Sequence, residues 1–264
     1  MAGTIVRIPL GGATEGGRIF GVEASGIAGC NGVTAASLGG EPLHLAGSGA
    51  DLHAFAGIPI DSSRGITLRL QCVGGGTTSL RIPTAAGSYR MERLQVAPRF
   101  SAPPDSALSA RLARESARAA QVSRAAHDTP PLFEQPFARP RPSRITSPFG
   151  GGRMFNGTVT SRHMGTDFAG AVGTPVAASN RGVVRIVDAF YLGGNVIYID
   201  HGAGIVTAYL HLSKQLVAVG DTVQRGQTIG QVGASGRVTG PHLHFIARYG
   251  QITVDPASLF SLVE

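Results

Sequence analysis

The residues best suited to chemistry lie in the last part of the sequence. Five of the eight histidines come after residue 142, and an aspartate lies four positions after the first of them. The residues concerned are His163, Asp167, His201, His211, His242 and His244. Histidine and carboxylate side chains gathered in this way are typical ligands and proton carriers of a hydrolytic metal site.

Their spacing favours a zinc site. A catalytic zinc ion takes three protein ligands from His, Asp, Glu or Cys and leaves a fourth position for water. Hydrolysis also needs a base near the water and a donor for the developing oxyanion. A His-x-x-x-Asp pair, a histidine near a strand end and a His-x-His pair supply more groups than three ligands require. The surplus indicates a hydrolytic site, although a pair of half-exposed histidines would be the simpler interpretation of His242 and His244 alone.

Strands must position these groups. The alternation of Gly240-Pro-His-Leu-His-Phe245 predicts a strand with His242 and His244 on one face, and Leu243 and Phe245 on the other. His211 follows a predicted strand over 205–210. His201 lies between two predicted strands, where we expect a turn residue with a structural role.

Residues 143–264 are predicted to form a strand-rich, glycine-punctuated domain. The expected strands cover 182–187, 195–200, 205–210, 228–232 and 243–248. Strands do not alternate with helices along this stretch, so an antiparallel sheet is expected rather than a parallel one.

Two other regions precede this domain. Residues 1–97 contain short alternating strands, at 4–8, 67–73, 77–82 and 88–96, which predict a small β-sandwich. Residues 98–142 are predicted to be a linker. It has one helix over about 105–127, capped by Asp105 and carrying a thin apolar stripe, and then a segment with five prolines. The fold class is therefore mostly β.

Composition limits the partners. The 264 residues carry a formal net charge of +7, but the basic residues are spread out and no aromatic residues are interleaved with them. Attraction to an anionic polymer such as a cell wall is consistent with this charge, whereas specific nucleic-acid binding is not expected. No apolar stretch approaches the roughly 20 residues of a membrane span, so no transmembrane segment is predicted.

Cys30 and Cys72 are the two cysteines of the chain. The sequence leaves open whether they form a disulfide, which would close a loop worth about 4 kcal/mol, or stay as buried thiols. The first residues carry no charged segment followed by an apolar one, so a secretion signal is either absent or already removed.

Three motifs together resemble the lysostaphin-type (LytM-like) zinc metallopeptidases. They are His163-Met-Gly-Thr-Asp167, Thr207-Ala-Tyr-Leu-His211-Leu-Ser213 and Gly240-Pro-His-Leu-His-Phe245, in the order and spacing of that family. The resemblance covers about residues 144–257. Residues 57–96 resemble, less closely, the small immunoglobulin-like domain that precedes the peptidase in some Gram-negative members.

The resemblance implies roles for the residues. One zinc ion would be held by His163, Asp167 and His244, in a groove of an antiparallel sheet. His211 and His242 would act on the water and stabilise the tetrahedral intermediate or carry the proton. The implied reaction is hydrolysis of peptide cross-links in bacterial peptidoglycan, at the D-alanyl–diaminopimelate bond of the stem peptides, by water that the metal activates.

The same resemblance implies a periplasmic or extracellular location, with the signal peptide removed, and regulation by the N-terminal domain. The alternative is a non-catalytic LytM-like protein that binds and activates a cell-wall amidase. Such proteins usually lack some ligands, and this sequence lacks none of them.

Overall fold

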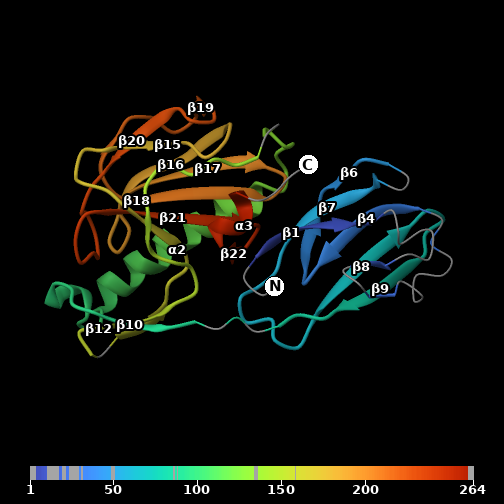
Figure 1. The fold of residues 1–264 in the computed structure, drawn as a ribbon, viewed down its shortest axis with the longest axis horizontal. Helices are drawn as coiled ribbons and strands as arrows, with labels where there is room; N and C mark the ends of the chain where they lie inside the picture. Colours follow the sequence, from blue (N-terminus) through green and yellow to red (C-terminus); the bar gives the residue numbers. More distant parts are fainter. Residues whose placement is uncertain are drawn as a thin grey trace. The chain divides into compact units, whose positions relative to one another are not determined.

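The computed structural model describes residues 4–10, 18–19, 22–23, 30, 32–48, 51–85, 87, 89–133, 136–157 and 159–260. The chain divides into two compact units, Met1–Gly87 and Ser88–Glu264. Both are built mainly from antiparallel strands (Figure 1). Among the described residues, no helix is both long and apolar enough to cross a membrane.

The first unit contains two main antiparallel sheets and one short hairpin. One sheet has the order β1-β7-β6, the other has the order β5-β4-β8-β9, and the hairpin pairs β2 with β3. The strands are β1 (Ile5–Pro9), β2 (Arg18–Ile19), β3 (Val22–Glu23), β4 (Val33–Leu38), β5 (Glu41–Leu43), β6 (Leu45–Ala46), β7 (His53–Gly57), β8 (Ile66–Cys72) and β9 (Thr77–Ile82). The β-sandwich expected here agrees with two sheets, whereas the immunoglobulin-like assignment stays a prediction.

Strand β8 shows why these residues form a two-layer core. Its buried and exposed positions alternate, so that Ile66, Leu68 and Leu70 point inward and the polar residues between them point outward. At its end Cys72 forms a disulfide with Cys30, with Cα atoms 5.2 Å apart. The disulfide therefore ties the segment before β4 to the end of β8, which settles the question that the sequence left open.

The second unit is built on one large antiparallel sheet. Its strands follow the order β11-β14-β21-β18-β17-β16-β19, with β20 also pairing with β18 and β15, and β22 with β21. The strands are β11 (Ile145–Ser147), β14 (Thr166–Ala169), β15 (Pro175–Ala177), β16 (Gly182–Phe190), β17 (Gly194–Gly202), β18 (Ile205–Gln215), β19 (Thr222–Val223), β20 (Thr228–Val232), β21 (His242–Tyr249) and β22 (Ile252–Val254), and the short helix α3 (Pro256–Phe260) follows. All five strands predicted for this domain are present, and four of them are longer than predicted.

The two faces of this sheet have different coverings. One face carries a buried apolar core that includes Tyr209, Leu243 and Phe245. On the other face, helix α2 (Ser106–Ala125) packs Ala119 and Ala126 against apolar side chains of β16, β17 and β18. The polar site lies farther along this second face, beyond the helix.

The linker predicted for residues 98–142 is packed against the second unit. Asp105 caps α2 by accepting a hydrogen bond from the amide of Leu108 at 2.7 Å, as predicted. After the helix, the proline-rich segment has no helix or strand among its described residues. It is nevertheless held by main-chain hydrogen bonds from Leu132 to His201 and from Ala138 to Ser179, 2.8 Å each.

The segment before the linker differs from expectation. The strand expected over 88–96 was assigned to the first domain, but β10 (Met91–Leu94) instead pairs in parallel with β12 (Gly152–Phe155), which pairs with β13 (Val159–Arg162). The 3₁₀ turn η3 (Pro98–Phe100) follows. The break between the units therefore falls at Gly87, before the predicted boundary after residue 97. The reason is that β10 pairs with main-chain groups more than 50 residues away, which a local pattern cannot reveal.

Candidate metal centre and groove

The five predicted site residues lie together at one end of the large sheet. Register places Asp167 of β14 opposite His244 of β21, and His244 opposite Leu210 of β18. Side chains that face each other across neighbouring strands lie about 5 Å apart, so this row brings the carboxylate and the imidazole together. His242, two positions before His244, shares its face, as predicted.

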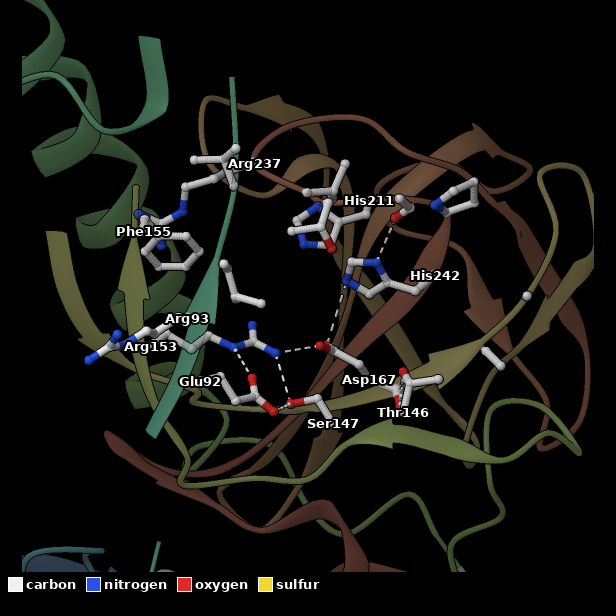
Figure 2. A pocket seen from close by; sticks show the side chains of 18 of the residues that line it. Glu92, Arg93, Thr146, Ser147, Arg153, Phe155, Asp167, His211, Arg237 and His242 are labelled. Carbon is white, nitrogen blue, oxygen red and sulfur yellow. Dashed lines mark hydrogen bonds and ion pairs between the residues drawn. The ribbon is translucent and has the colours of Figure 1, made fainter. Parts of the chain in front are cut away.

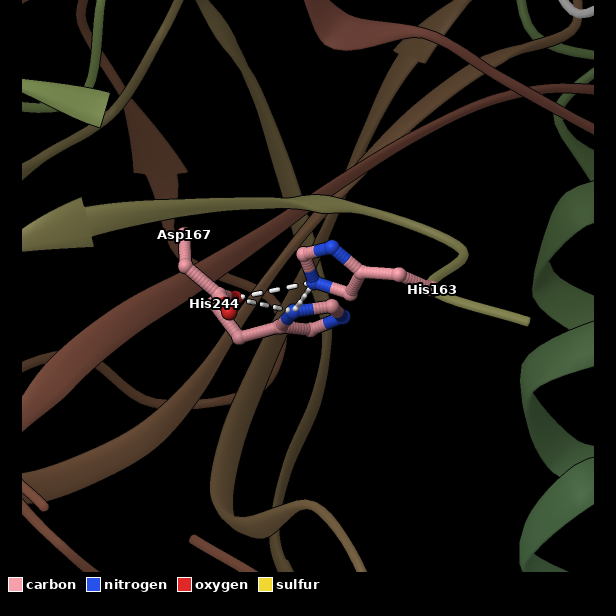
Figure 3. Close-up of side chains that lie close together, drawn as sticks. All are labelled: His163, Asp167 and His244. Carbon is pink, nitrogen blue, oxygen red and sulfur yellow. Dashed lines mark hydrogen bonds and ion pairs between the residues drawn. The ribbon is translucent and has the colours of Figure 1, made fainter. Parts of the chain in front are cut away.

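His163, Asp167 and His244 form a triangle of potential ligand atoms (Figure 3). Nε2 of His163 lies 3.0 Å from Oδ1 of Asp167 and 3.0 Å from Nδ1 of His244, and Nδ1 of His244 lies 2.7 Å from the same oxygen. All three side chains are buried. Ligands of a tetrahedral zinc ion, each about 2.1 Å from the metal, are about 3.4 Å apart, so two imidazoles and a carboxylate at these distances fit that metal.

A close approach at Gly165 sets this geometry. His163 lies between β13 and β14, and its main-chain amide and carbonyl bond to residues 150 and 151. A Cβ atom on Gly165 would lie 2.6 Å from Cε1 of His244 and 2.7 Å from the carbonyl oxygen of Phe245. Glycine at this position therefore lets the turn pass directly over the ligand on β21.

A β-bulge brings His211 to the site. Tyr209 pairs with Ile197 and Leu212 with Asn195, so two residues of β18 face one residue of β17. His211 has φ of +64°, a conformation that non-glycine residues rarely adopt. Strict alternation would turn His211 toward the core beside Tyr209, and the bulge turns it to the opposite face. The sequence placed His211 at a strand end, but β18 continues to Gln215.

Hydrogen bonds fix both histidines that flank the triangle. Nδ1 of His211 lies 2.8 Å from the carbonyl oxygen of Ser235, and Nδ1 of His242 lies 2.9 Å from that of Gly240. Each Nδ1 therefore carries the proton, which leaves Nε2 as the acceptor. Nε2 of His242 lies 3.7 Å from Oδ1 of Asp167, beside the triangle.

Burial and hydrogen bonding set the charges at the centre. Burial by itself would raise the pKa of Asp167, but hydrogen bonds and charge attraction from His163 and His244 hold it well below its usual value. Burial lowers the pKa of His244 to about 4 and that of His211 to about 3. An ionised carboxylate beside neutral imidazoles is the donor set that a metal cation requires.

His201 lies apart from this group. It is fully buried within β17, rather than in the turn that the sequence indicated, and its Nδ1 lies 2.7 Å from the carbonyl oxygen of Arg181. Its Nε2 lies 2.8 Å from the hydroxyl of Thr207. Both ring nitrogens are therefore engaged in the interior, which agrees with the structural role predicted for it.

The sequence reasoning missed a network that holds the outer atoms of the triangle (Figure 2). Arg153 of β12 donates to Oδ2 of Asp167 at 2.5 Å and to the hydroxyl of Ser147 at 3.0 Å. Glu92 of β10 accepts from Nε of Arg153 at 3.2 Å and from Ser147 at 2.9 Å. Ser147 also lies 3.2 Å from Nδ1 of His163. No sequence signal marks Glu92, because it reaches the site only through the parallel pairing of β10 with β12.

A hollow of about 630 Å³ opens over the centre and is lined by residues of β10, β12, β14 and the loop before β21 (Figure 2). A smaller hollow of about 170 Å³ lies against His163 and His244. Arg153, Phe155, His211 and Arg237 border both of them. The two hollows meet at these shared residues and form one groove across the centre, wide enough for an extended peptide.

Comparison with known proteins agrees with this arrangement. Residues 161–256 match the family described as Peptidase family M23. Over 105 residues the chain is 50% identical to the peptidoglycan DD-endopeptidase ShyA of Vibrio cholerae, which covers 39% of this chain and 24% of that protein. Over 118 residues it is 45% identical to the DD-carboxypeptidase/endopeptidase Mpg of Neisseria meningitidis, covering 44% of this chain and 27% of that protein. The chain thus spans about a quarter of the length of the curated relatives that it matches.

A solved structure extends the likeness beyond that domain. A crystal structure from Pseudomonas aeruginosa assigned to peptidase M23 aligns with a TM-score of 0.72 and 25% identity, covering 100% of this chain and 96% of that one. The buried His and Asp triangle, the bulged strand carrying His211 and the sequence match all fall within residues 161–256. Over these residues, the chain carries a domain of peptidase family M23.

Proposed function

We propose that this protein is a zinc-dependent endopeptidase that hydrolyses peptide cross-links of bacterial peptidoglycan. The observation that carries the proposal is the triangle of buried ligand atoms, with edges of 2.7–3.0 Å, flanked on its groove side by two further histidines. A structural metal site would be closed by protein ligands, whereas this one offers three ligands and opens on a groove.

Each residue has a distinct task in this proposal. His163, Asp167 and His244 hold a single zinc ion, which when bound supplies a Lewis acid that polarises the scissile carbonyl and lowers the pKa of water. His211 and His242 each have an Nε2 that can accept a proton from the attacking water and pass it to the leaving amine. The low pKa of His211 keeps it neutral, and thus able to accept, at neutral pH.

The proposed substrate is the bond between D-alanine and diaminopimelate in cross-linked stem peptides. It is supported by the relatives named peptidoglycan DD-endopeptidases. A substrate in the cell wall implies a periplasmic or extracellular location. The alternative function, as a non-catalytic activator of an amidase, has no support in a site whose five functional groups all lie together.

Single substitutions test the assignment of roles. Replacing His163, Asp167 or His244 by alanine should abolish both stoichiometric zinc binding and hydrolysis. Replacing His211 or His242 by alanine should abolish hydrolysis and leave zinc bound. Zinc is measured by metal analysis of the purified protein, and hydrolysis by mass spectrometry of fragments released from purified sacculi, which also identifies the bond. Full activity in either of the last two variants would refute the roles given to them.

Regulation by the N-terminal unit is a further part of the proposal. The informative truncation keeps residues 88–264 rather than 143–264, because Glu92 and β10 belong to the second unit. If the first unit restricts the groove, this truncation raises activity on sacculi without changing zinc content. Equal activity of the truncated and full chains would exclude inhibition by residues 1–87.

A further inference from the structure

Arg237 is a half-buried cation at the centre of the groove. It borders both hollows, next to His211. Its guanidinium lies 4.0 Å from the centre of the Phe155 ring, so the ring covers one of its faces. Among the described residues, no carboxylate or carbonyl group accepts a hydrogen bond from its side chain.

The loop that carries Arg237 holds it in a defined place. Its main-chain amide donates to the carbonyl of Leu192 at 2.9 Å. Gly236, at φ of +76°, lies so close to residues 192–194 that any Cβ atom would clash. Ser235, two residues before Arg237, supplies the carbonyl that holds His211. The guanidinium is therefore fixed relative to a group proposed to carry protons.

The charges around Arg237 do not balance it. Arg153 lies nearby, and burial together with the charge of Arg153 lowers the pKa of Arg237. The two acids of the hollow, Glu92 and Asp167, are already paired with Arg153. Burying a cation without a partner is costly, so a bound anion would relieve the cost at this position.

Two further arginines extend the positive charge to the rim. Arg93 and Arg144 line the larger hollow and are exposed, and no acid pairs with either among the described residues. Exposed cations of this kind raise the local concentration of an anionic ligand more than they strengthen its final contacts. The groove thus has one fixed anion position at Arg237 and an attractive rim.

We propose that Arg237 binds a carboxylate that the substrate peptide carries next to the scissile bond, and so selects substrates with a free acid at that position. The proposal rests on the proposed peptidase function and deepens it. Guanidinium groups suit this task because their planar fork donates two parallel hydrogen bonds to a carboxylate.

The chemistry of the proposed substrate provides such an acid. When diaminopimelate is acylated on one amino group, the carbon that bears the scissile nitrogen also bears a carboxylate. Converting this carboxylate to a carboxamide removes the charge and keeps the size nearly unchanged. A pair of synthetic cross-linked peptides that differ only in this way therefore isolates the contact.

The experiment measures kcat/KM on the acid and amide peptides for the full-length protein loaded with zinc. The wild-type protein should prefer the acid by about 10- to 100-fold, the range expected for a charged hydrogen-bonded pair. Arg237→Gln should lose that preference, mainly by slowing cleavage of the acid peptide. Arg237→Lys should keep part of it. Arg114→Gln removes the same charge from an exposed position of α2 and should leave the preference unchanged.

The outcomes separate this proposal from the one on which it rests. Equal cleavage of the two peptides by the wild-type protein would overturn the carboxylate subsite and leave the peptidase function standing. Equal loss of activity by Arg237→Gln on both peptides, with zinc still bound, would also overturn it. A wild-type protein that binds zinc and cuts neither peptide nor sacculi would instead refute the proposed function. A wild-type preference that disappears in Arg237→Gln and partly returns in Arg237→Lys would support the subsite.

Discussion

Replacing Glu92 by glutamine should weaken zinc binding, although Glu92 lies outside the residues that match the peptidase family. The change removes one negative charge and keeps the shape of the side chain. Arg153 then has only Asp167 as an anionic partner, because its other acid is gone. A stronger pull on Oδ2 of Asp167 draws electron density away from the oxygen that faces the metal position, and the site also loses one nearby negative charge. Both effects act against a cation.

The structure limits the size of this effect. Substitution of residues that hold metal ligands typically costs 10- to 100-fold in metal affinity. The side chain of Glu92 is 32% exposed while that of Arg153 is 14% exposed, so solvent screens part of the interaction. We therefore expect a loss near the lower end, about 10-fold, which corresponds to about 1.4 kcal/mol.

The assay is competition for zinc between the metal-free protein and a chelating dye of known affinity. Asp128→Asn, in the exposed turn after α2, removes the same charge far from the centre and serves as the control. Thermal unfolding of the metal-free proteins should give nearly equal midpoints for the two variants. That result would assign the difference to the metal site rather than to general stability.

A double substitution tests the route of the effect. If Glu92 acts chiefly through Arg153, Glu92→Gln should change the zinc affinity much less when Arg153 is already methionine. Zinc affinity that is the same in Glu92→Gln and wild type would refute the reasoning. An undiminished effect in the Arg153→Met background would place the action on Ser147 instead.

Three further predictions concern other parts of the chain. Replacing Cys30 and Cys72 by alanine should lower the free energy of unfolding of the first unit by about 4 kcal/mol, measured by denaturant titration, because a disulfide with a sequence separation of 42 no longer restricts the unfolded chain; an unchanged midpoint would contradict this. Burial lowers the pKa of His201 from 6.5 to about 4, so this histidine contributes full stability above pH 6.5 and loses it as the unfolded chain takes up a proton between pH 6.5 and 4, by up to about 3 kcal/mol. His201→Gln should flatten the dependence of stability on pH in that window, and an unaltered slope would exclude His201 as its source. Gly165→Ala should displace His244 and reduce zinc affinity more than it reduces stability of the metal-free protein, and unchanged affinity would show that the turn can move aside.

The site could be predicted from the sequence to the extent that local motifs encode it. His163 and Asp167 lie within one short turn, and His242 and His244 lie on one strand. Their relative positions are therefore set by nearby residues. The strand alternation also predicted that Leu243 and Phe245 would be buried on the opposite face, which the structure confirms.

The groups that hold and surround the ligands could not be predicted in this way. Glu92 and Arg153 are 61 residues apart and meet through a parallel strand pair with no local signature. Arg237 lies in a glycine-rich loop where the sequence suggests only a turn, and its isolation becomes visible once its neighbours are known. Long-range pairing, rather than residue type, gives these side chains their significance.

The large sheet was predictable in kind but not in its irregularities. The sequence predicts antiparallel strands, and the extra length of β17 and β18 placed His201 and His211 inside strands rather than beside them. Strand limits depend on partners that extend the ladder, and these partners are distant in sequence.

The bulge in β18 makes His211 equivalent to a one-residue insertion. Tyr209 and Leu212 both face the core, and each pairs with β17 in the register that an uninterrupted strand would have if one residue between them were missing. Deleting His211 would therefore leave the ladder and the apolar core intact, and would also remove the left-handed backbone conformation at that position. The sheet has no structural need of this residue. A catalytic group can in this way be gained or lost by a change in chain length, with no rearrangement of the strands around it.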